Sequence, residues 1–138
     1  MRRCLIVANQ TLTGPALMRA VVDRQVREPC DFHIVVPATH QHGTAAWTEG
    51  GALAHARSTL QHALEQFGDA GIPATGEVGD ASPMLAVGDV LRREHIDEII
   101  LSTLPPGASK WLKRDLPHRL ARYHLPVTHI VADPVPVA

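Results

Sequence analysis

The chain has 138 residues, with 13 lysines and arginines against 14 aspartates and glutamates. A formal net charge of −1 provides no overall field that would attract nucleic acid or a membrane surface. Hydrophobic residues make up 45% of the chain, enough for one core, and no apolar run approaches the roughly 18 residues that cross a bilayer. Cys4 and Cys30 stand at apolar runs, so we expect two buried thiols and a cytoplasmic protein.

Five short apolar runs predict the strands of a sheet. They are Cys4–Ala8, Phe32–Pro37, Ala74–Val78, Glu98–Ser102 and Val127–Ala132. Four of the runs are rich in Ile and Val and nearly continuous, which is typical of parallel strands covered by helices on both faces. The more polar run, Ala74–Val78, is expected at an edge of the sheet.

Three helices are indicated between the first four runs. The first is predicted to begin with Thr13 as N-cap and Pro15 in its first turn. Leu17, Val21 and Arg24 then share one face of this helix. The second has apolar residues at intervals of three and four from position 53 to position 67, and it is predicted to stop before one of the glycines at positions 68 and 71. The third is expected to begin at position 82, with a serine as N-cap and a proline in the first helical position.

The fourth helical segment lies within Ser109–His124. Pro117 would break a helix interior, so we predict a short turn at Ser109–Arg114 and then a helix from about Asp115 to Tyr123. The alternation of strands and helices predicts one α/β domain over residues 1–133, followed by a short tail at 134–138. Its sheet is expected to be parallel, doubly wound and five-stranded, in the order 3-2-1-4-5, with four helices.

A ligand is expected outside the carboxyl ends of the first and fourth strands, where the winding of such a sheet reverses. The loops Asn9–Thr13 and Ser102–Gly107 would line this crevice, and a basic segment follows the second loop. Backbone amides at the start of the following helix, together with nearby lysines and arginines, favour an anion site. The alternative interpretation is that the second loop is a simple turn and that the basic residues form a solvated helix face. The candidate ligand-binding residues are Ala8, Asn9, Thr11, Val36, Ser102, Thr103, Pro105, Gly107, Lys113 and Arg114.

Nearly the whole chain resembles the universal stress protein family. The resemblance rests on the first strand with its polar loop, the strand Phe32–Pro37, the helix start Gly79-Asp80-Ala81-Ser82-Pro83, the strand Asp97–Ser102 and the closing Leu125-Pro126-Val127-Thr128-His129-Ile130-Val131. It implies a Rossmann-like fold of the HUP nucleotide-binding type, a binding and regulatory role, and a homodimer formed through Val127–Ala132. The exposed apolar edge that this last strand would present also favours pairing.

The ATP-binding branch of that family has the signature Gly-x2-Gly-x9-Gly-[Ser/Thr] after the fourth strand. The same spacing from Ser102 falls on Ser102, Pro105, Asp115 and Leu116, so the three glycines and the hydroxyl residue are missing. Pro105 has no N–H to donate, and the Asp115 carboxylate would cap the next helix and repel a polyphosphate. We therefore predict a nucleotide or small anion as ligand. The missing glycines disfavour ATP and AMP, and the sequence identifies no certain cofactor.

Other chemistries have weaker support in the sequence. The histidine pairs His40/His42 and His55/His62 do not supply the converging ligands of a zinc site, so no metal is expected. Nucleophile and phosphate-loop motifs are missing, and we predict that the protein is not an enzyme. A small enzyme acting on a phosphorylated or adenylated compound and an interaction module without ligand are the alternatives. The long segment Ala38–Gly51 is either a lid or a simple connection.

Overall fold

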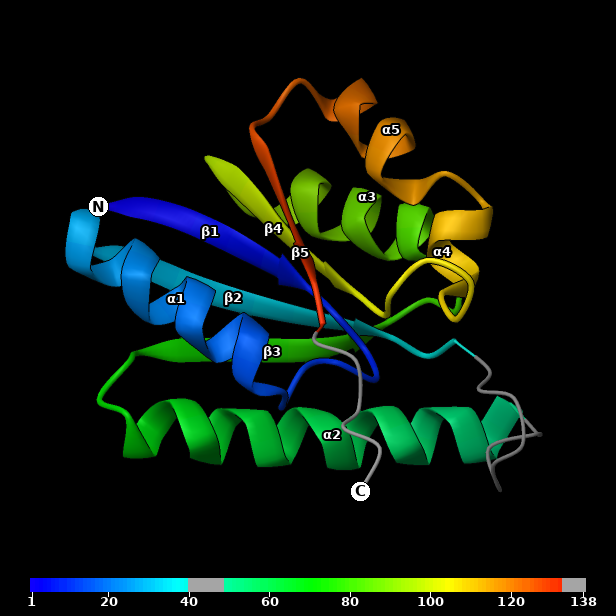
Figure 1. The fold of residues 1–138 in the computed structure, drawn as a ribbon, viewed down its shortest axis with the longest axis horizontal. Helices are drawn as coiled ribbons and strands as arrows, with labels where there is room; N and C mark the ends of the chain where they lie inside the picture. The colour runs from blue at the N-terminus through cyan, green and yellow to red at the C-terminus, as the bar shows by residue number, and fades with distance from the viewer. Residues whose placement is uncertain (40–48, 133–138) are drawn as a thin grey trace.

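The chain folds around a parallel sheet of five strands (Figure 1). The computed structural model describes residues 1–39 and 49–132. The strands follow the order β3-β2-β1-β4-β5, as predicted, and all four pairings are parallel. Their bounds are β1 Arg2–Val7, β2 Cys30–Pro37, β3 Ala74–Gly79, β4 Glu98–Thr103 and β5 Val127–Val131. Positions 40–48 of the predicted segment Ala38–Gly51, which include His40 and His42, lie outside the described residues, as does the predicted tail 134–138.

Helices cover both faces of the sheet (Figure 1). Helices α1 (Pro15–Arg27) and α2 (Glu49–Asp69) pack on one face. The other face carries α3 (Pro83–Arg93), α4 (Lys110–Lys113), α5 (Leu116–Leu120) and the 3-10 helix η1 (Ala121–Tyr123). The prediction of four helices is therefore corrected to five α-helices and one 3-10 helix within residues 1–39 and 49–132.

The first helix begins one residue later than the sequence suggested. Gly14, not Thr13, is the N-cap, with φ −78° and ψ 158°. The reason is Pro15 in the first turn, since a residue before proline is held in the extended region. The third helix begins as predicted, because the Ser82 hydroxyl accepts a hydrogen bond from the backbone N–H of Leu85 at 3.5 Å.

The last helical segment is divided by a left-handed residue. Asp115 has φ 57° and ψ 40°, and it separates α4 from α5. Pro117 lies in the first turn of α5, as predicted, where its missing N–H has no helical partner to lose. The expectation that the Asp115 carboxylate caps this helix is wrong, because its side chain makes no capping hydrogen bond in the left-handed conformation.

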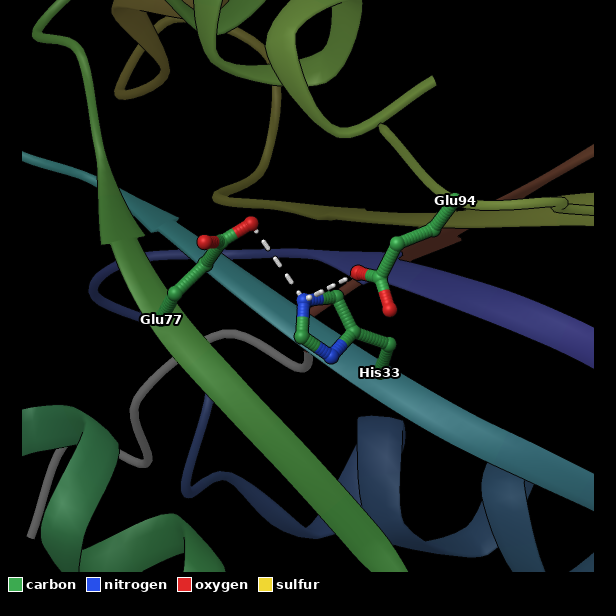
Figure 2. A group of neighbouring side chains, drawn as sticks. All are labelled: His33, Glu77 and Glu94. Carbon is green, nitrogen blue, oxygen red and sulfur yellow. Dashed lines mark hydrogen bonds and ion pairs between the residues drawn. The ribbon is translucent and has the colours of Figure 1, made fainter. Parts of the chain in front are cut away.

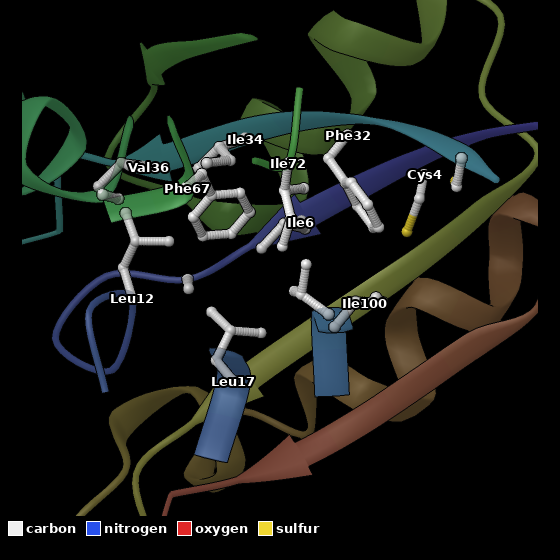
Figure 3. Packing of buried hydrophobic residues seen from close by; sticks show 14 of the residues in the cluster. Cys4, Ile6, Leu12, Leu17, Phe32, Ile34, Val36, Phe67, Ile72 and Ile100 are labelled. Carbon is white, nitrogen blue, oxygen red and sulfur yellow. The ribbon is translucent and has the colours of Figure 1, made fainter. Parts of the chain in front are cut away.

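The sheet separates two hydrophobic cores. On the α1 and α2 side, Phe32 and Phe67 meet edge to face with ring centroids 6.5 Å apart, beside Ile6, Leu17 and Ile100 (Figure 3). On the other side, Val87 of α3 and Leu116 and Leu120 of α5 pack against strand residues. Alternate residues of a strand face opposite cores, so both sets of side chains must be apolar. This explains why the strands are nearly continuous apolar runs in the sequence. Among the described residues, no helix has both the length and the apolar character needed to cross a membrane.

Candidate functional site

A cavity of about 230 Å³ opens at the carboxyl ends of β1 and β4, where the winding of the sheet reverses. Its walls come from the loop after β1, the segment after β2, the end of β4 and the start of α4. The described lining residues are Asn9, Gln10, Thr11, Thr39, Ser102, Thr103, Leu104, Ala108, Ser109, Lys110 and Trp111.

The loop after β1 is fixed by hydrogen bonds of its own backbone and by Asn9. The N–H of Leu12 donates to the carbonyl of Asn9 at 3.1 Å, and the N–H of Gly14 donates to that of Thr11 at 3.0 Å. The buried Asn9 amide donates from Nδ2 to the carbonyl of Pro37 at 2.6 Å, which ties this loop to the end of β2. The turn therefore presents Thr11 to the cavity in a defined position.

Two buried hydroxyl groups meet in the wall of the cavity. Thr11 Oγ1 and Ser102 Oγ are 2.5 Å apart, although the residues are 91 positions apart in the sequence. Only 1% of Ser102 and 6% of Thr11 is exposed. One hydroxyl donates to the other, so one of the two protons and several lone pairs stay available. This pair can therefore bind an uncharged polar group or share in binding an anion.

The next residue of β4, Thr103, connects the cavity to the edge strand. Its Oγ1 and Nε2 of His129 are 2.8 Å apart, and Thr103 is 2% exposed. His129 is an exposed residue of β5, and the partial desolvation of its ring disfavours the imidazolium form and lowers its pKa. A neutral ring at this position keeps a hydrogen-bonding partner for Thr103 without adding a charge beside the cavity.

The remaining wall is formed by the turn after β4 and by α4. The N–H groups of Ala108 and Ser109 both donate to the carbonyl of Pro105, and Gly107 allows this turn with φ +90°. The Ser109 hydroxyl caps α4 by accepting from the N–H of Leu112 at 3.2 Å. Capping orients α4 so that the largely buried Trp111 faces the cavity.

Four of the candidate ligand-binding residues line this cavity: Asn9, Thr11, Ser102 and Thr103. The others do not. Ala8 and Val36 belong to the core on the α1 and α2 side, because their side chains alternate away from the crevice. Pro105 and Gly107 support the turn without lining the cavity.

The basic candidates also lie apart from the cavity. Lys113 and Arg114 are exposed at the end of α4 and are not lining residues. Lys110, at the first position of α4, is the basic residue that the described lining contains. Helix α4 has only four residues, so it ends before another turn could place Lys113 or Arg114 at the crevice.

Sequence reasoning missed Thr39, Ala108, Ser109 and Trp111 as lining residues. Thr39 follows the end of β2 by two positions, so the rule that ligands bind at the carboxyl ends of strands could have identified it. Trp111 follows Ser109 by two positions, and the helix start at this serine would have been the signal.

A scan against models of known protein families finds no match to this chain, and a search of curated proteins finds none either.

Proposed function

We propose that the chain is a universal-stress-protein-like binding and regulatory module that holds a small ligand at the crevice between β1 and β4. The observation that carries the proposal is the Thr11–Ser102 hydroxyl pair, which is buried in the cavity wall at the switch point of the sheet. Such a pair offers both donors and acceptors to a ligand. In this proposal the module acts by binding, without catalysis.

The size and charge of the cavity favour a ligand smaller than ATP. Its volume of about 230 Å³ lies below the range of roughly 300–1,000 Å³ that is usual for drug-sized ligands. Lys110 would have to balance most of the charge of a triphosphate, since Lys113 and Arg114 lie outside the lining. We propose a small nucleotide or another small anion as ligand, and ATP binding weaker than about 100 μM, equivalent to about −5.5 kcal/mol.

The test begins with the ligand that the protein retains. Mass spectrometry of purified, denatured protein should release a small hydrogen-bonding compound, and adenosine, AMP, ATP and inorganic phosphate are then compared by thermal shift. Ala108→Leu places bulk at the exposed rim of the cavity, whereas Ala70→Leu adds the same bulk to an exposed turn after α2. We expect Ala108→Leu to abolish the shift and Ala70→Leu to retain it. Equal shifts in both variants, or a low-micromolar affinity for ATP, would contradict the proposal.

We further propose a twofold dimer in which Val127–Ala132 meets its copy, with His129 near the axis. β5 lies at an edge of the sheet, it contains no lysine or arginine, and Val131 is 41% exposed. An unguarded apolar edge favours pairing with another strand. Light scattering should give twice the chain mass. Val131→Lys should give the monomer, and it is preferable to Ile130→Lys because Ile130 packs against the core. A wild-type monomer at micromolar concentration would exclude this assembly.

The cytoplasm is the compartment that we propose. Cys4 and Cys30 are free and buried, and burial raises the pKa of both thiols. Cysteines without a disulfide are typical of a reducing compartment, where buried, protonated thiols act as small hydrophobic residues. Fractionation of the native host should recover the protein with cytoplasmic markers.

A further inference from the structure

A histidine and two glutamates converge away from the crevice, where β2, β3 and the end of α3 meet (Figure 2). His33 Nε2 is 3.3 Å from Glu77 Oε1 and 3.3 Å from Glu94 Oε2. His33 is buried, with 7% of its surface exposed, whereas the side chains of Glu77 and Glu94 are 30% and 24% exposed. The cluster therefore consists of a buried histidine and two partly exposed glutamates.

The spacing of these three atoms is also compatible with a bound cation. One ligand atom from each of the three residues lies within 4.8 Å of the other two. The hydrogen bond between His33 Nε2 and Glu77 Oε1 is long at 3.3 Å, because the usual range for an N–H···O bond is about 2.7–3.2 Å. In a tetrahedral zinc site, bonds of about 2.0–2.2 Å separate neighbouring ligand atoms by about 3.3–3.6 Å. The two separations from His33 Nε2 fall at the lower end of that interval, and the two carboxylate oxygens lie within 4.8 Å of each other.

Neighbouring groups orient two of the three side chains. His33 Nδ1 is 2.7 Å from Thr75 Oγ1, which fixes the ring so that Nε2 faces both carboxylates. Arg3 Nη2 donates to Glu94 Oε1 at 2.7 Å, and this leaves Glu94 Oε2 directed at His33. A hydrogen bond to the second nitrogen of a histidine and a donor to the second oxygen of a carboxylate are the usual supports of metal ligands.

We propose that His33, Glu77 and Glu94 bind one divalent transition-metal ion of the zinc class, with water at the fourth position. Imidazole nitrogen and carboxylate oxygen are accepted ligands of such ions. The ion would connect β2 and β3 to the end of α3, so its binding stabilises this edge of the sheet. The site is separate from the crevice, and the proposal does not depend on the proposed function.

Arg93 is the competitor for this ion. Its Nη2 lies 2.5 Å from Glu77 Oε1, the same oxygen that faces His33, and its side chain is 53% exposed. Binding of a cation therefore requires Arg93 to move into solvent or Glu77 to offer its other oxygen. A pure ion-pair network and a metal site respond oppositely when Arg93 is removed, and this difference supplies the decisive test.

The experiment titrates metal-free protein with Zn²⁺ by calorimetry and with Co²⁺ by visible absorption, which reports coordination geometry. We expect one equivalent to bind wild type, at least tenfold weaker binding to Glu94→Gln, and at least fivefold tighter binding to Arg93→Gln. Glu94→Gln keeps the shape of the side chain and an oxygen that can accept from Arg3, so we expect this variant to fold. It therefore tests metal binding even if the more disruptive variant His33→Ala does not fold. His62→Ala, at an exposed position of α2, is the control and should bind as wild type does.

Three outcomes would overturn the proposal. They are no binding of either ion to wild type, equal affinity in wild type and Glu94→Gln, and equal or weaker affinity in Arg93→Gln. The last outcome would mean that Arg93, Glu77, His33 and Glu94 form only an ion-pair network.

Discussion

At the carboxyl end of the sheet the buried polar groups are neutral, whereas at the amino end they are charged and paired. Thr11, Ser102 and Thr103 line the crevice with hydroxyl groups. Glu98, the first residue of β4, instead accepts from Arg24 Nε at 2.9 Å and from Arg24 Nη2 at 2.5 Å. Arg24 Nη1 donates to the carbonyl of Glu28 at 2.8 Å, so every nitrogen of this guanidinium has a partner.

The difference indicates where the molecule can bind a ligand through its buried polar groups. A buried charge is tolerable only when it is paired and hydrogen-bonded, and a paired charge has little capacity left for a ligand. Two hydroxyls that bond each other still hold a free proton and free lone pairs. Among the described residues, the carboxyl end is therefore suited to recognition and the Arg24–Glu98 pair to structure.

Breaking the Arg24–Glu98 pair should have the largest effect. Arg24→Ala leaves the Glu98 carboxylate buried without its main partner, and such a loss costs about 3–5 kcal/mol of unfolding free energy. Arg2 Nε, 3.5 Å from Glu98 Oε1, partly compensates and favours the lower end of that range. Urea denaturation at pH 7 measures the change. Arg27→Ala, at an exposed position of the same helix, is the matched control.

The double variant Arg24→Met with Glu98→Leu sharpens the result. Because both charges are removed together, we expect it to be more stable than Arg24→Ala alone. A single variant as stable as wild type would show that the pair is not the element that holds α1 on the amino end of the sheet.

At the crevice, Thr11→Val should have a moderate effect. The variant leaves the buried Ser102 hydroxyl without its partner, which costs about 1–3 kcal/mol. Adding Ser102→Ala removes the second polar group, so the double variant should lose less than the sum of the two single variants. Denaturant unfolding of the four proteins completes the cycle. Additive losses would mean that the two hydroxyls do not form the bond on which the proposed site depends.

Much of the fold was predictable from local patterns. Nearly continuous apolar runs predicted the parallel strands, and the third helix was predicted from the serine and proline at its start. The periodicity of the first helix placed Leu17, Val21 and Arg24 on one face, and all three are buried. Asp115 was not predictable, because the left-handed conformation of a non-glycine residue is set by the packing of α4 and α5 around it.

The candidate site was predictable only where it follows from topology. Asn9, Thr11, Ser102 and Thr103 come directly after, or at the end of, strands that meet at the switch point, so the strand order identified them. Lys113 and Arg114 were selected for charge, which does not say where a four-residue helix will point. The cluster of His33, Glu77 and Glu94 comes from three separate elements and has no spacing motif.

Acid should weaken the charged end of the sheet before the neutral end. The hydrogen bond from Arg24 lowers the pKa of Glu98. The pair therefore contributes its full stability above the ordinary glutamate pKa of about 4.3, and the contribution is lost as pH falls through the lowered pKa of the folded state. Glu98→Gln should lose less stability than wild type between pH 5 and pH 3, whereas Glu65→Gln, exposed on α2, should follow wild type. Parallel losses in all three proteins would assign acid sensitivity to other groups.

The smallest effect is expected from His129, the group that links the edge strand to the crevice. Partial desolvation of the ring lowers the pKa of His129 in the folded protein, so the unfolded chain, with a histidine pKa of about 6.5, takes up a proton first as pH falls. The stability that the neutral ring contributes is complete above about pH 6.5 and declines as pH falls through the lowered pKa. His129→Gln keeps a hydrogen-bonding side chain beside Thr103 but has no proton to gain. Melting temperatures between pH 8 and pH 5.5 should therefore fall slightly less in His129→Gln than in wild type, whereas the exposed control His62→Gln should match wild type. An NMR titration of the His129 ring gives the pKa directly. A pKa at or above 6.5 would mean that water reaches the His129 ring freely. The buried Thr103 hydroxyl would then have no neutral hydrogen-bonding partner that persists at the edge strand as pH falls.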